Sequence, residues 1–448
     1  MAAFQPHREP SLFRTKYAPA APVVHLPPRP HDKKGGRVPG RADLAEPVME
    51  WTRERYRETS RAFAPFMSSL ASTLGRSERR LAATQYVGGL LLPGQCKRLR
   101  PLAVWLGIDH QSLQQFLTNS PWNDQDVWSA IRQRLLARLD SIDLWLIELR
   151  AWEKQGKHSV GVSYQSSGPH IKKRNCQISI EVLLGRKSVA APVAGHLYLP
   201  ETWAGDDELR HRAGVPHEVP AESRAELAIR LIGNVLEDGV PKAPVVADSG
   251  FGDDSGFRRA LRTLGLEYFL EINPRKHWGY GTGDGRRATS TCLLDQVIMS
   301  GSIQDWEYVF YPNGKSRGSR FLWQRILLTS QAAPPEPCWL VAEWPQSAQS
   351  YYRAFLANLR GAPSDDLSSA LFTSTECLRN HQSCFERILD LNSYQGRTWS
   401  GFHHHLVLAA AACAFVVTQE LERHGLRVAE TPSDPLILGE AMRMAALI

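Results

Sequence analysis

Apolar side chains recur at helical spacing between residues 50 and 139. Phe63, Phe66, Met67, Leu70 and Leu74 lie three or four positions apart, as the buried face of a helix requires. The same spacing continues in Leu102–Leu106, Leu113–Leu117 and Trp128–Leu139. Ser120–Asp124 has the composition of a turn and N-cap before the last of these segments. The pattern predicts an all-α domain over residues 50–139.

From Leu144 onward the helical spacing gives way to short apolar runs typical of β-strands. The first four expected strands are Leu144–Leu149, Ser159–Tyr164, Cys176–Leu184 and Ser188–Leu199. A helix over Ala221–Glu237, a strand over Val245–Asp248, a helix over Gly256–Leu264 and a strand over Tyr268–Ile272 follow. This order predicts an α/β fold with a mixed sheet, compatible with the RNase-H-like fold, whose first part spans residues 140–273.

The chain after residue 273 divides into a β-rich segment and a helical one. Residues 274–345 are expected to form a β-rich insertion, with strands at Trp306–Tyr311, Phe321–Thr329 and Trp339–Val341. Helices expected at 346–360, 367–391 and 399–423 would complete the core over residues 346–425, and residues 426–448 are expected to be a tail. Leu406–Val417 is apolar but too short to span a bilayer, which favours a buried helix.

Composition is that of an ordinary globular protein. The 448 residues are 43% hydrophobic and 22% charged, enough for a large core and two or three domains. The N-terminus lacks the apolar stretch of a secretory signal. Seven cysteines occur without a CxxC pair, which favours reduced thiols over disulfides or zinc. A cytoplasmic, nucleoid-associated protein with no membrane partner is the expectation.

Positive charge is concentrated in two N-terminal segments. The formal net charge is +7, which permits polyanion binding without establishing it. Residues 1–48 are basic and Pro-rich, and they predict a disordered tail or, as the alternative, an arm that lies on phosphates. The helical domain is rich in arginine, so it is a candidate DNA-contacting module, although no helix-turn-helix signature is evident in it.

Two of the expected strands end on a carboxylate. Leu144–Ile147 is followed by Glu148, and Val245–Ala247 is followed by Asp248. Strands that each deliver one acid at their C-terminal ends are how metal-dependent phosphoryl-transfer sites gather oxygen ligands for a pair of divalent ions. Glu148 and Asp248 are therefore the candidate metal ligands.

Several local runs resemble one family. They are Gly156–Val162 with Tyr164–Gln165, Leu197–Trp203 with Arg212–Pro216, Val246–Gly252, and Tyr394–His403. Together they resemble the DDE-type bacterial insertion-sequence transposases, of the insertion-sequence-seven-hundred-and-one kind, over residues 55 to 425. The resemblance implies an RNase-H-like fold in which three acids hold two Mg²⁺ ions for attack on a DNA phosphodiester.

The acid set departs from the pattern of that family. Asp248 matches the second acid, but Glu148 stands where the family has Asp, and Leu149 stands where it has another acid. A glutamate displaces the carboxylate, and a misplacement of about 1 Å can reduce a rate about a hundredfold. The resemblance thus implies an impaired first ligand.

The third acid of the family has no clear equivalent. Two alignments from Tyr394 place it at Arg379 or at Gln382, and neither is an acid. Glu376, one helical turn before Arg379, and Glu386 are the candidate replacements if the helix register has shifted. Mg²⁺ is therefore an expected cofactor only if the protein is active, with Glu148, Asp248 and Glu376 as the catalytic set.

Cations near the expected site are candidates for phosphate contacts. The candidate DNA-binding residues are Lys154, Lys157, His158, Lys172, Lys173, Arg174, Arg397 and Trp399. The partner implied by the resemblance is double-stranded DNA that resembles transposon ends, bound by a possible homodimer. His403–His405 resembles a metal cluster, but adjacent helical residues point about 100° apart, so a structural role is favoured.

Four functional hypotheses remain. The first is a DNA-binding, transposase-like protein that is catalytically impaired or repurposed, a pseudoenzyme of the DDE superfamily. The second is an active transposase that performs DNA recombination and transposition through Mg²⁺-dependent cleavage and strand transfer. The third is chemistry on a small, non-DNA substrate, and the fourth is a decaying reading frame with no selected role.

Overall fold

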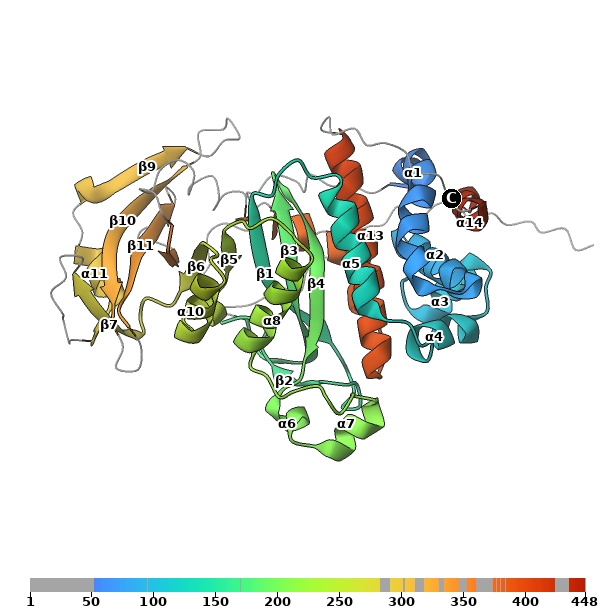
Figure 1. Cartoon of the computed structure of the whole chain (residues 1–448), viewed down its shortest axis with the longest axis horizontal. Helices are drawn as coiled ribbons and strands as arrows, with labels where there is room; N and C mark the ends of the chain where they lie inside the picture. Colours follow the sequence, from blue (N-terminus) through green and yellow to red (C-terminus); the bar gives the residue numbers. More distant parts are fainter. Residues whose placement is uncertain are drawn as a thin grey trace, which may run out of the picture. The chain divides into compact units, whose positions relative to one another are not determined.

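The computed structural model describes residues 52–447, with gaps at 95, 170, 283–290, 301–302, 311–317, 330–333, 346–352, 360–373, 376, 379, 383 and 424–434. The Pro-rich segment 1–48 lies outside the described residues. The structure begins with a group of helices (Figure 1). These are α1 (Arg53–Ala71), α2 (Ser77–Leu91), α3 (Leu99–Leu106), α4 (His110–Thr118) and α5 (Asp124–Leu136), with a 3₁₀ turn at Ser72–Leu74.

The sheet that follows has the order of an RNase-H-like fold. Its first six strands are β1 (Leu144–Glu153), β2 (Ser163–Gln165), β3 (Arg174–Arg186), β4 (Val189–Tyr198), β5 (Val245–Ala247) and β6 (Tyr268–Ile272). β3 pairs antiparallel with β1, β2 and β4, whereas β1, β5 and β6 are parallel neighbours. A mixed α/β sheet preceded by helices, as the sequence predicts, is therefore present.

Helices connect and cover these strands. The connecting helices are α6 (Glu201–Ala204), α7 (Asp207–Ala213), α8 (Arg224–Glu237), α9 (Ser249–Gly252) and α10 (Ser255–Thr263). α8 begins with a capping box, in which Ser223 and Glu226 satisfy each other's backbone N–H groups, and it packs on β3 and β4.

The insertion extends the core sheet instead of forming a separate layer. It contains β7 (His277–Thr282), β8 (Thr291–Leu293), α11 (Leu294–Ser300), β9 (Trp306–Phe310), β10 (Gly318–Leu328) and β11 (Glu336–Pro345), with a 3₁₀ turn at Ile303–Asp305. β12 (Arg353–Ala357) pairs with both β6 and β11, and so joins the insertion to the core. Among the described residues, 12 strands form one sheet.

Two predictions for the C-terminal part are wrong. The expected helix over 346–360 is a strand at its described centre, β12, because four consecutive apolar residues, Ala354–Ala357, fit a buried strand as well as a buried helix. The expected tail over 426–448 contains α14 (Pro435–Ala446), which packs on α1 and α2 and buries Ala441 and Met444. Residues 374–382, where described, are helical, followed by a π-helical turn at Cys384–Ile388 and a 3₁₀ turn at Leu391–Ser393.

Helix α13 (Trp399–Arg423) is the central helix of the molecule. It contacts β4, α2, α4 and α5, and so stands between the sheet and the N-terminal helices (Figure 1). By length and hydropathy it could span a membrane, but its apolar window is 100% buried within the protein. The prediction of a buried helix over Leu406–Val417 is therefore confirmed.

Candidate functional site

Glu148 and Asp248 lie at matching positions on two neighbouring parallel strands. β1 and β5 pair in register up to Leu146 and Val246. Each acid comes two residues after its strand's member of that pair, and Asp248 continues the extended backbone just beyond β5. Since side chains alternate along a strand, Glu148 lies on the face of Leu146. Asp248 lies beyond the end of β5, and its side chain is close to Gly168 and Gly250. The fold thus places the two acids on or just beyond neighbouring strands. β1 continues to Glu153, so Glu148 lies within its strand and not at the end, where the sequence pattern places it.

The Glu148 carboxylate is held by two basic side chains of the protein itself. The Arg150 guanidinium lies 3.3 Å from Glu148 Oε2, and His381 Nε2 lies 3.2 Å from the same oxygen. Gln382 is a further hydrogen-bonding partner of this carboxylate. Burial would raise the pKa of Glu148, but the charges of Arg150 and His381 outweigh burial and lower that pKa to about 2. Glu148 is therefore an ionised, internally paired group.

A second carboxylate, Glu181, completes this buried cluster. Glu181 of β3 is the register partner of Glu148 and is fully buried. Arg150 Nε donates to Glu181 Oε1 at 3.1 Å, and the Ser179 hydroxyl donates to the same oxygen at 2.8 Å. We call Glu148, Arg150, Glu181 and His381 the ion cluster. Its charges balance when His381 is protonated, since two carboxylates then face two cations.

His381 occupies a position that suits two protonation states. Its Nε2 lies 2.8 Å from an Arg150 guanidinium nitrogen and 3.2 Å from the Glu148 carboxylate. A protonated Nε2 donates to Glu148, whereas a bare Nε2 accepts from Arg150. Burial opposes the charge on His381, but the Glu148 carboxylate and hydrogen bonds to Glu148 and Glu181 outweigh it and raise the pKa of His381. The two carboxylates therefore favour the protonated form of His381 relative to a free histidine.

Asp248 has different surroundings. Its Oδ1 accepts the backbone N–H of Gly250 at 2.9 Å, so the side chain caps α9. Burial outweighs these backbone hydrogen bonds and raises the pKa of Asp248. The two predicted ligands are thus shifted in opposite directions: Glu148 is held ionised by internal cations, and Asp248 is disfavoured as an anion.

A cavity of about 380 Å³ opens beside Asp248. Its walls include Leu149, Ile171 and Phe251, and its cationic groups are Lys173 and Arg224. Leu149 is the residue that stands where the resembling family has an acid. The lining residues include no carboxylate. The lining of this cavity is therefore largely apolar and cationic, and it offers no further carboxylate.

The structure describes one of the two positions aligned with the family's third acid, Gln382. Gln382 forms a hydrogen bond with Glu148, so of the two aligned positions it is one that lies beside the first candidate acid. A glutamine offers a neutral amide there. Glu386 lies on the exposed side of the π-helical turn. Glu376 and Arg379 lie outside the described residues.

The donors at this site do not fit a pair of Mg²⁺ ions. Mg²⁺ requires hard oxygen ligands in near-octahedral geometry. Glu148 is already paired with two cationic groups, and those cations oppose a metal ion next to them. Within the part of the chain that the structure describes, no group of three His, Cys, Asp or Glu side chains has the arrangement of a metal site. We therefore derive no metal-dependent step at this site.

The predicted phosphate contacts divide into exposed and internal groups. Lys157, His158, Lys172, Lys173 and Arg397 have exposed side chains. Arg174 is exposed but paired with Glu153. Lys154 donates to the backbone carbonyl of Tyr394 and lies over its ring, and burial lowers the pKa of Lys154 to about 8. Trp399 is 8% exposed and packs against His196 and His403.

The three adjacent histidines have structural roles. All are buried on α13 and point to different neighbours. The partners are the backbone N–H of Leu197 for His403, the backbone carbonyl of Leu117 for His404 and the Tyr86 hydroxyl for His405. His404 also stacks on Trp122 with ring centroids 3.7 Å apart. The favoured structural interpretation agrees with this placement.

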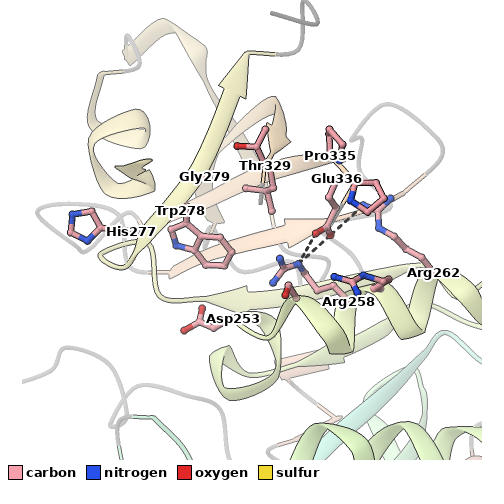
Figure 2. A pocket seen from close by; sticks show the side chains of 13 residues that line it. Asp253, Arg258, Arg262, His277, Trp278, Gly279, Thr329, Pro335 and Glu336 are labelled. Carbon is pink, nitrogen blue, oxygen red and sulfur yellow. Dashed lines mark hydrogen bonds and ion pairs between the residues drawn. The ribbon is translucent and has the colours of Figure 1, made fainter. Parts of the chain in front are cut away.

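A second cavity, of about 320 Å³, lies between α10 and the insertion (Figure 2). Arg258, Arg262 and Trp278 line it together with Glu336, and Figure 2 shows Arg258 and Glu336 turned toward each other. Arg258 Nε lies 3.1 Å from Glu336 Oε1, and its guanidinium lies 5.3 Å from the centre of the Trp278 ring. Two of the arginines at this cavity therefore have an internal counter-charge.

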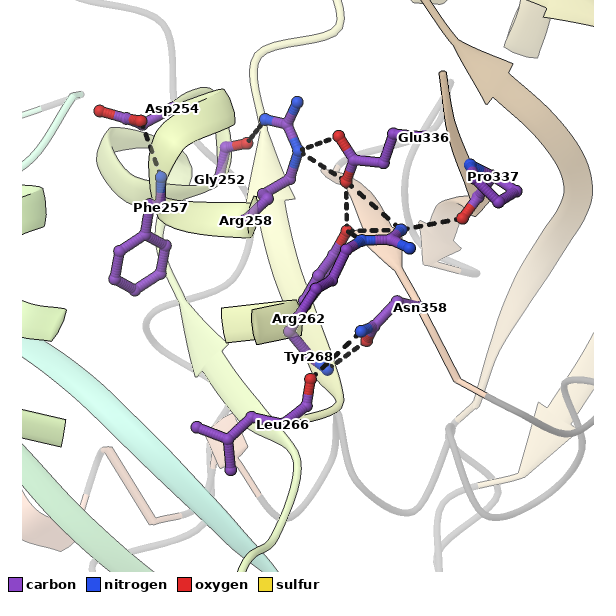
Figure 3. A network of polar contacts seen from close by, with 10 residues as sticks. All are labelled: Gly252, Asp254, Phe257, Arg258, Arg262, Leu266, Tyr268, Glu336, Pro337 and Asn358. Atoms are coloured by element: carbon purple, nitrogen blue, oxygen red, sulfur yellow. Dashed lines mark hydrogen bonds and ion pairs between the residues drawn. The ribbon is translucent and has the colours of Figure 1, made fainter. Parts of the chain in front are cut away.

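The network around Glu336 joins three elements (Figure 3). Arg258 and Arg262 come from α10, Tyr268 begins β6, and Glu336 begins β11. Burial would raise the pKa of Glu336, but Arg258 and a hydrogen bond from Tyr268 outweigh it and lower that pKa. The Arg262 guanidinium also donates to the backbone carbonyl of Pro337 at 2.8 Å. This network fastens the insertion to the core, and we assign it a structural role.

Sequence reasoning missed Arg150, Glu181 and His381. The available signal was Glu181, a carboxylate in the centre of the apolar run Ile178–Leu184. A buried charge requires a partner, but the partner's identity depends on strand register and on a helix 200 residues away.

A comparison with known protein families gives one match. A family model described as DDE superfamily endonuclease matches residues 69–278, a segment that contains Glu148, Asp248 and the strands that carry them. No curated protein matches the chain. Over residues 69–278, this chain is thus similar to the DDE superfamily endonucleases.

Proposed function

We propose that this chain is a DNA-binding protein of DDE transposase ancestry in which two-metal cleavage of DNA has been lost. The observation that carries the proposal is the ion cluster. Arg150 and His381 supply, from within the protein, positive charge beside Glu148, and Gln382 supplies a neutral amide where a third acid is expected. The match to an endonuclease family supports DNA as the partner.

Exposed cations support a role in DNA binding. Lys157, His158, Lys172 and Lys173 lie in loops that follow β1 and β2, and Arg397 immediately precedes α13. Such side chains provide affinity for phosphates without sequence information. We extend the proposal to double-stranded DNA resembling transposon ends, to a homodimer as the bound form, and to a cytoplasmic, nucleoid-associated location.

The test combines a binding assay with a cleavage assay on the full chain. We take Lys157, Lys172, Lys173 and Arg397 to neutralise one phosphate each. The logarithm of the binding constant should then fall against the logarithm of the salt concentration with a slope of about −3.6, which we call the salt slope. Affinity for a labelled duplex should fall roughly 150-fold between 50 and 200 mM salt. Changing Lys172 and Lys173 to Gln should reduce the slope by about 2. The exposed Arg212, changed to Gln, is the matched control and should leave the slope unchanged.

Cleavage of the same duplex separates the proposal from an active transposase. We expect no strand cleavage with Mg²⁺ or Mn²⁺. Cleavage that disappears in Asp248→Asn would overturn the loss of catalysis. Absence of any salt-dependent duplex binding would overturn the DNA-binding part.

The cavity beside Asp248 favours a second candidate function, binding of a small organic anion. Lys173 and Arg224 would pair with its charge, and Leu149, Ile171 and Phe251 would contact its apolar part. Two results together would support this candidate. The duplex does not bind, and a small carboxylate or phosphate monoester raises the melting temperature of the wild type but not of Arg224→Gln.

A further inference from the structure

Two cysteines that are distant in the sequence meet in the interior of the protein. Cys384 begins the π-helical turn Cys384–Ile388, and Cys413 lies in the middle of α13. Both side chains are fully buried, and both thiols are free in the structure. Each is the other's hydrogen-bonding partner. Because a thiol–thiol hydrogen bond puts the sulfurs in contact, a disulfide of about 2 Å requires only a local movement.

The two thiols have different roles in this contact. Burial and the hydrogen bond to Cys384 raise the pKa of the Cys413 thiol. The hydrogen bond from Cys413, together with the charges of His381 and Arg150, outweighs burial and lowers the pKa of Cys384. Cys413 is thus the S–H donor and Cys384 the acceptor. Since the thiolate is the reactive form of cysteine, Cys384 is the nucleophile of the pair.

The ion cluster lies directly beside these thiols. His381 Nδ1 is 3.7 Å from Cys413 Sγ, while Nε2 of the same ring is 3.2 Å from the Glu148 carboxylate. A protonated ring donates from Nε2 to Glu148 and from Nδ1 toward the Cys413 sulfur. The positive charge of His381 therefore favours a negative sulfur at Cys413 as well as at Cys384.

Cys377, a buried cysteine of the same segment, has purely structural surroundings. Its Sγ lies 3.3 Å from the backbone carbonyl oxygen of Lys187 and 3.2 Å from that of Val189. Its thiol therefore donates to the β3–β4 turn, and burial raises its pKa. Cys377 thus provides the internal comparison for the Cys384–Cys413 pair.

A single short turn separates Cys384 from solvent. Glu386 and Arg387, described residues of the same π-helical turn, are exposed. Single π-helical turns are rare and occur frequently at functional sites. Short surface elements also open locally at a lower free energy than the whole fold. A small oxidant can reach the Cys384 sulfur through such an opening.

We propose that Cys384 and Cys413 form a redox-sensitive pair, which hydrogen peroxide converts into a disulfide. The Cys384 sulfur attacks the peroxide: an S–O bond forms, the O–O bond breaks, and water leaves a sulfenic acid behind. The Cys413 sulfur then attacks the Cys384 sulfur: the S–S bond forms, the S–O bond breaks, and the departing hydroxide takes the Cys413 proton. Two thiols have then lost two electrons and two protons, and one peroxide has become two waters.

The disulfide fastens the segment that carries His381 to α13. It closes a loop of about 30 residues, which should reduce the equilibrium constant for unfolding about 400-fold through the entropy of the unfolded chain. The inference goes beyond the proposed function and is independent of it, because neither the oxidation nor its effect on stability requires DNA.

Peptide mapping of the full chain tests the disulfide. The wild type is treated with hydrogen peroxide, its remaining thiols are blocked with N-ethylmaleimide in denaturant, and it is digested with trypsin without reduction. Mass spectrometry should find peptide 380–387 joined to peptide 398–423, and dithiothreitol should separate them. Cys384→Ser and Cys413→Ser should each abolish the joined peptides. Cys377→Ser is the matched control and should retain them.

Urea unfolding of the oxidised and the reduced wild type tests the effect on stability. The oxidised protein should unfold at the higher urea concentration, and dithiothreitol should remove the difference. N-ethylmaleimide on both Cys384 and Cys413 after peroxide treatment would overturn the proposal, as would a disulfide from either one to another cysteine, such as the exposed Cys96. Equal unfolding midpoints in the presence of the joined peptides would overturn the fastening of the segment to α13. All these outcomes are read on the wild type, so none depends on the folding of a variant.

Discussion

At the scale of single residues, Glu148 faces a like charge across the sheet, since its register partner is Glu181. Opposed like charges destabilise a strand pair. Arg150 lies between the two carboxylates and pairs with both, and His381 approaches the same pair from the C-terminal segment. Loss of one partner from such a buried arrangement typically costs about 3–5 kcal/mol. These four residues are therefore interdependent.

Protonation of His381 should make stability depend on pH. The groups that face its ring are Glu148, Arg150, Glu181 and Cys413. Because the pKa of His381 is raised in the folded protein, its contribution is fully present below the ordinary histidine pKa of 6.5 and is lost as pH rises through the higher folded value. We predict that the free energy of unfolding, measured in urea, falls as pH rises above 6.5.

His381→Gln should remove the fall in the free energy of unfolding that follows deprotonation of His381. Glutamine keeps a hydrogen-bonding amide but has no titrating group. His158→Gln, at an exposed loop position, serves as the control and should retain the fall. A slope that is identical in the wild type and in His381→Gln would show that His381 is not protonated in the cluster.

Asp248→Asn should stabilise the protein at neutral pH. The folded pKa of Asp248 is raised by burial, so its ionisation destabilises the fold as pH rises above the ordinary value of 3.8. Asparagine keeps an oxygen for the Gly250 N–H without the buried charge. We predict a higher melting temperature at pH 7, with the difference disappearing below pH 3.8.

The opposite sign is expected for Asp109→Asn. Hydrogen bonds from Ser112 lower the pKa of Asp109, so its ionised form stabilises the fold and its loss should lower the melting temperature at pH 7. Equal effects of the two substitutions would contradict the assignment of Asp248 as a disfavoured anion.

The sequence predicts one half of the site and not the other. Glu148 and Asp248 each end an apolar run, and neighbouring parallel strands bring such acids together, so their pairing can be foreseen. Arg150 and His381 cannot be foreseen in the same way. Their contacts depend on the register of β1 against β3 and on the packing of residues 374–382, which no local pattern encodes.

At the scale of elements, the close approach of α9 to β6 holds the Asp248 turn. A Cβ at Gly252 would lie 1.9 Å from the backbone oxygen of Glu271, a contact that requires the backbone to move. Gly252→Ala should therefore destabilise the protein by about 1–3 kcal/mol. Thermal denaturation monitored by circular dichroism measures the change.

Gly233→Ala is the matched control for this substitution. Gly233 lies inside α8, and a Cβ there meets nothing within 4 Å. Alanine in a helix interior should stabilise the protein by roughly 0.5–1 kcal/mol. If both substitutions stabilise, the approach of α9 to β6 is looser than described.

Element predictions succeed where the pattern is long or bounded by turns. β6 lies at Tyr268–Ile272, as predicted, and α8 and α10 lie within three residues of their expected starts. β12 fails because its apolar residues carry no period over so short a run. α14 was missed because 12 residues near the chain end give little periodicity, although tertiary packing on α1 and α2 stabilises them.

At the scale of the whole molecule, the ion cluster ties distant parts of the chain together. β1 and β3 contribute Glu148, Arg150 and Glu181, residues 374–382 contribute His381, and α13 contributes Cys413 at 3.7 Å from His381. The same junction in a two-metal enzyme would be held partly by bound cations. Here the protein's own side chains provide the positive charge.

The most direct test is a titration of the full chain with Mn²⁺, monitored by calorimetry and by water proton relaxation. The same titration of Asp248→Asn provides the comparison. Mn²⁺ takes the same hard oxygen ligands as Mg²⁺, and its paramagnetism reports binding at the site. The account predicts no binding at millimolar Mn²⁺ that distinguishes the wild type from Asp248→Asn. Saturable binding that Asp248→Asn abolishes would contradict it, because Glu148 and Asp248 would then be available ligands and not members of a site already neutralised from within.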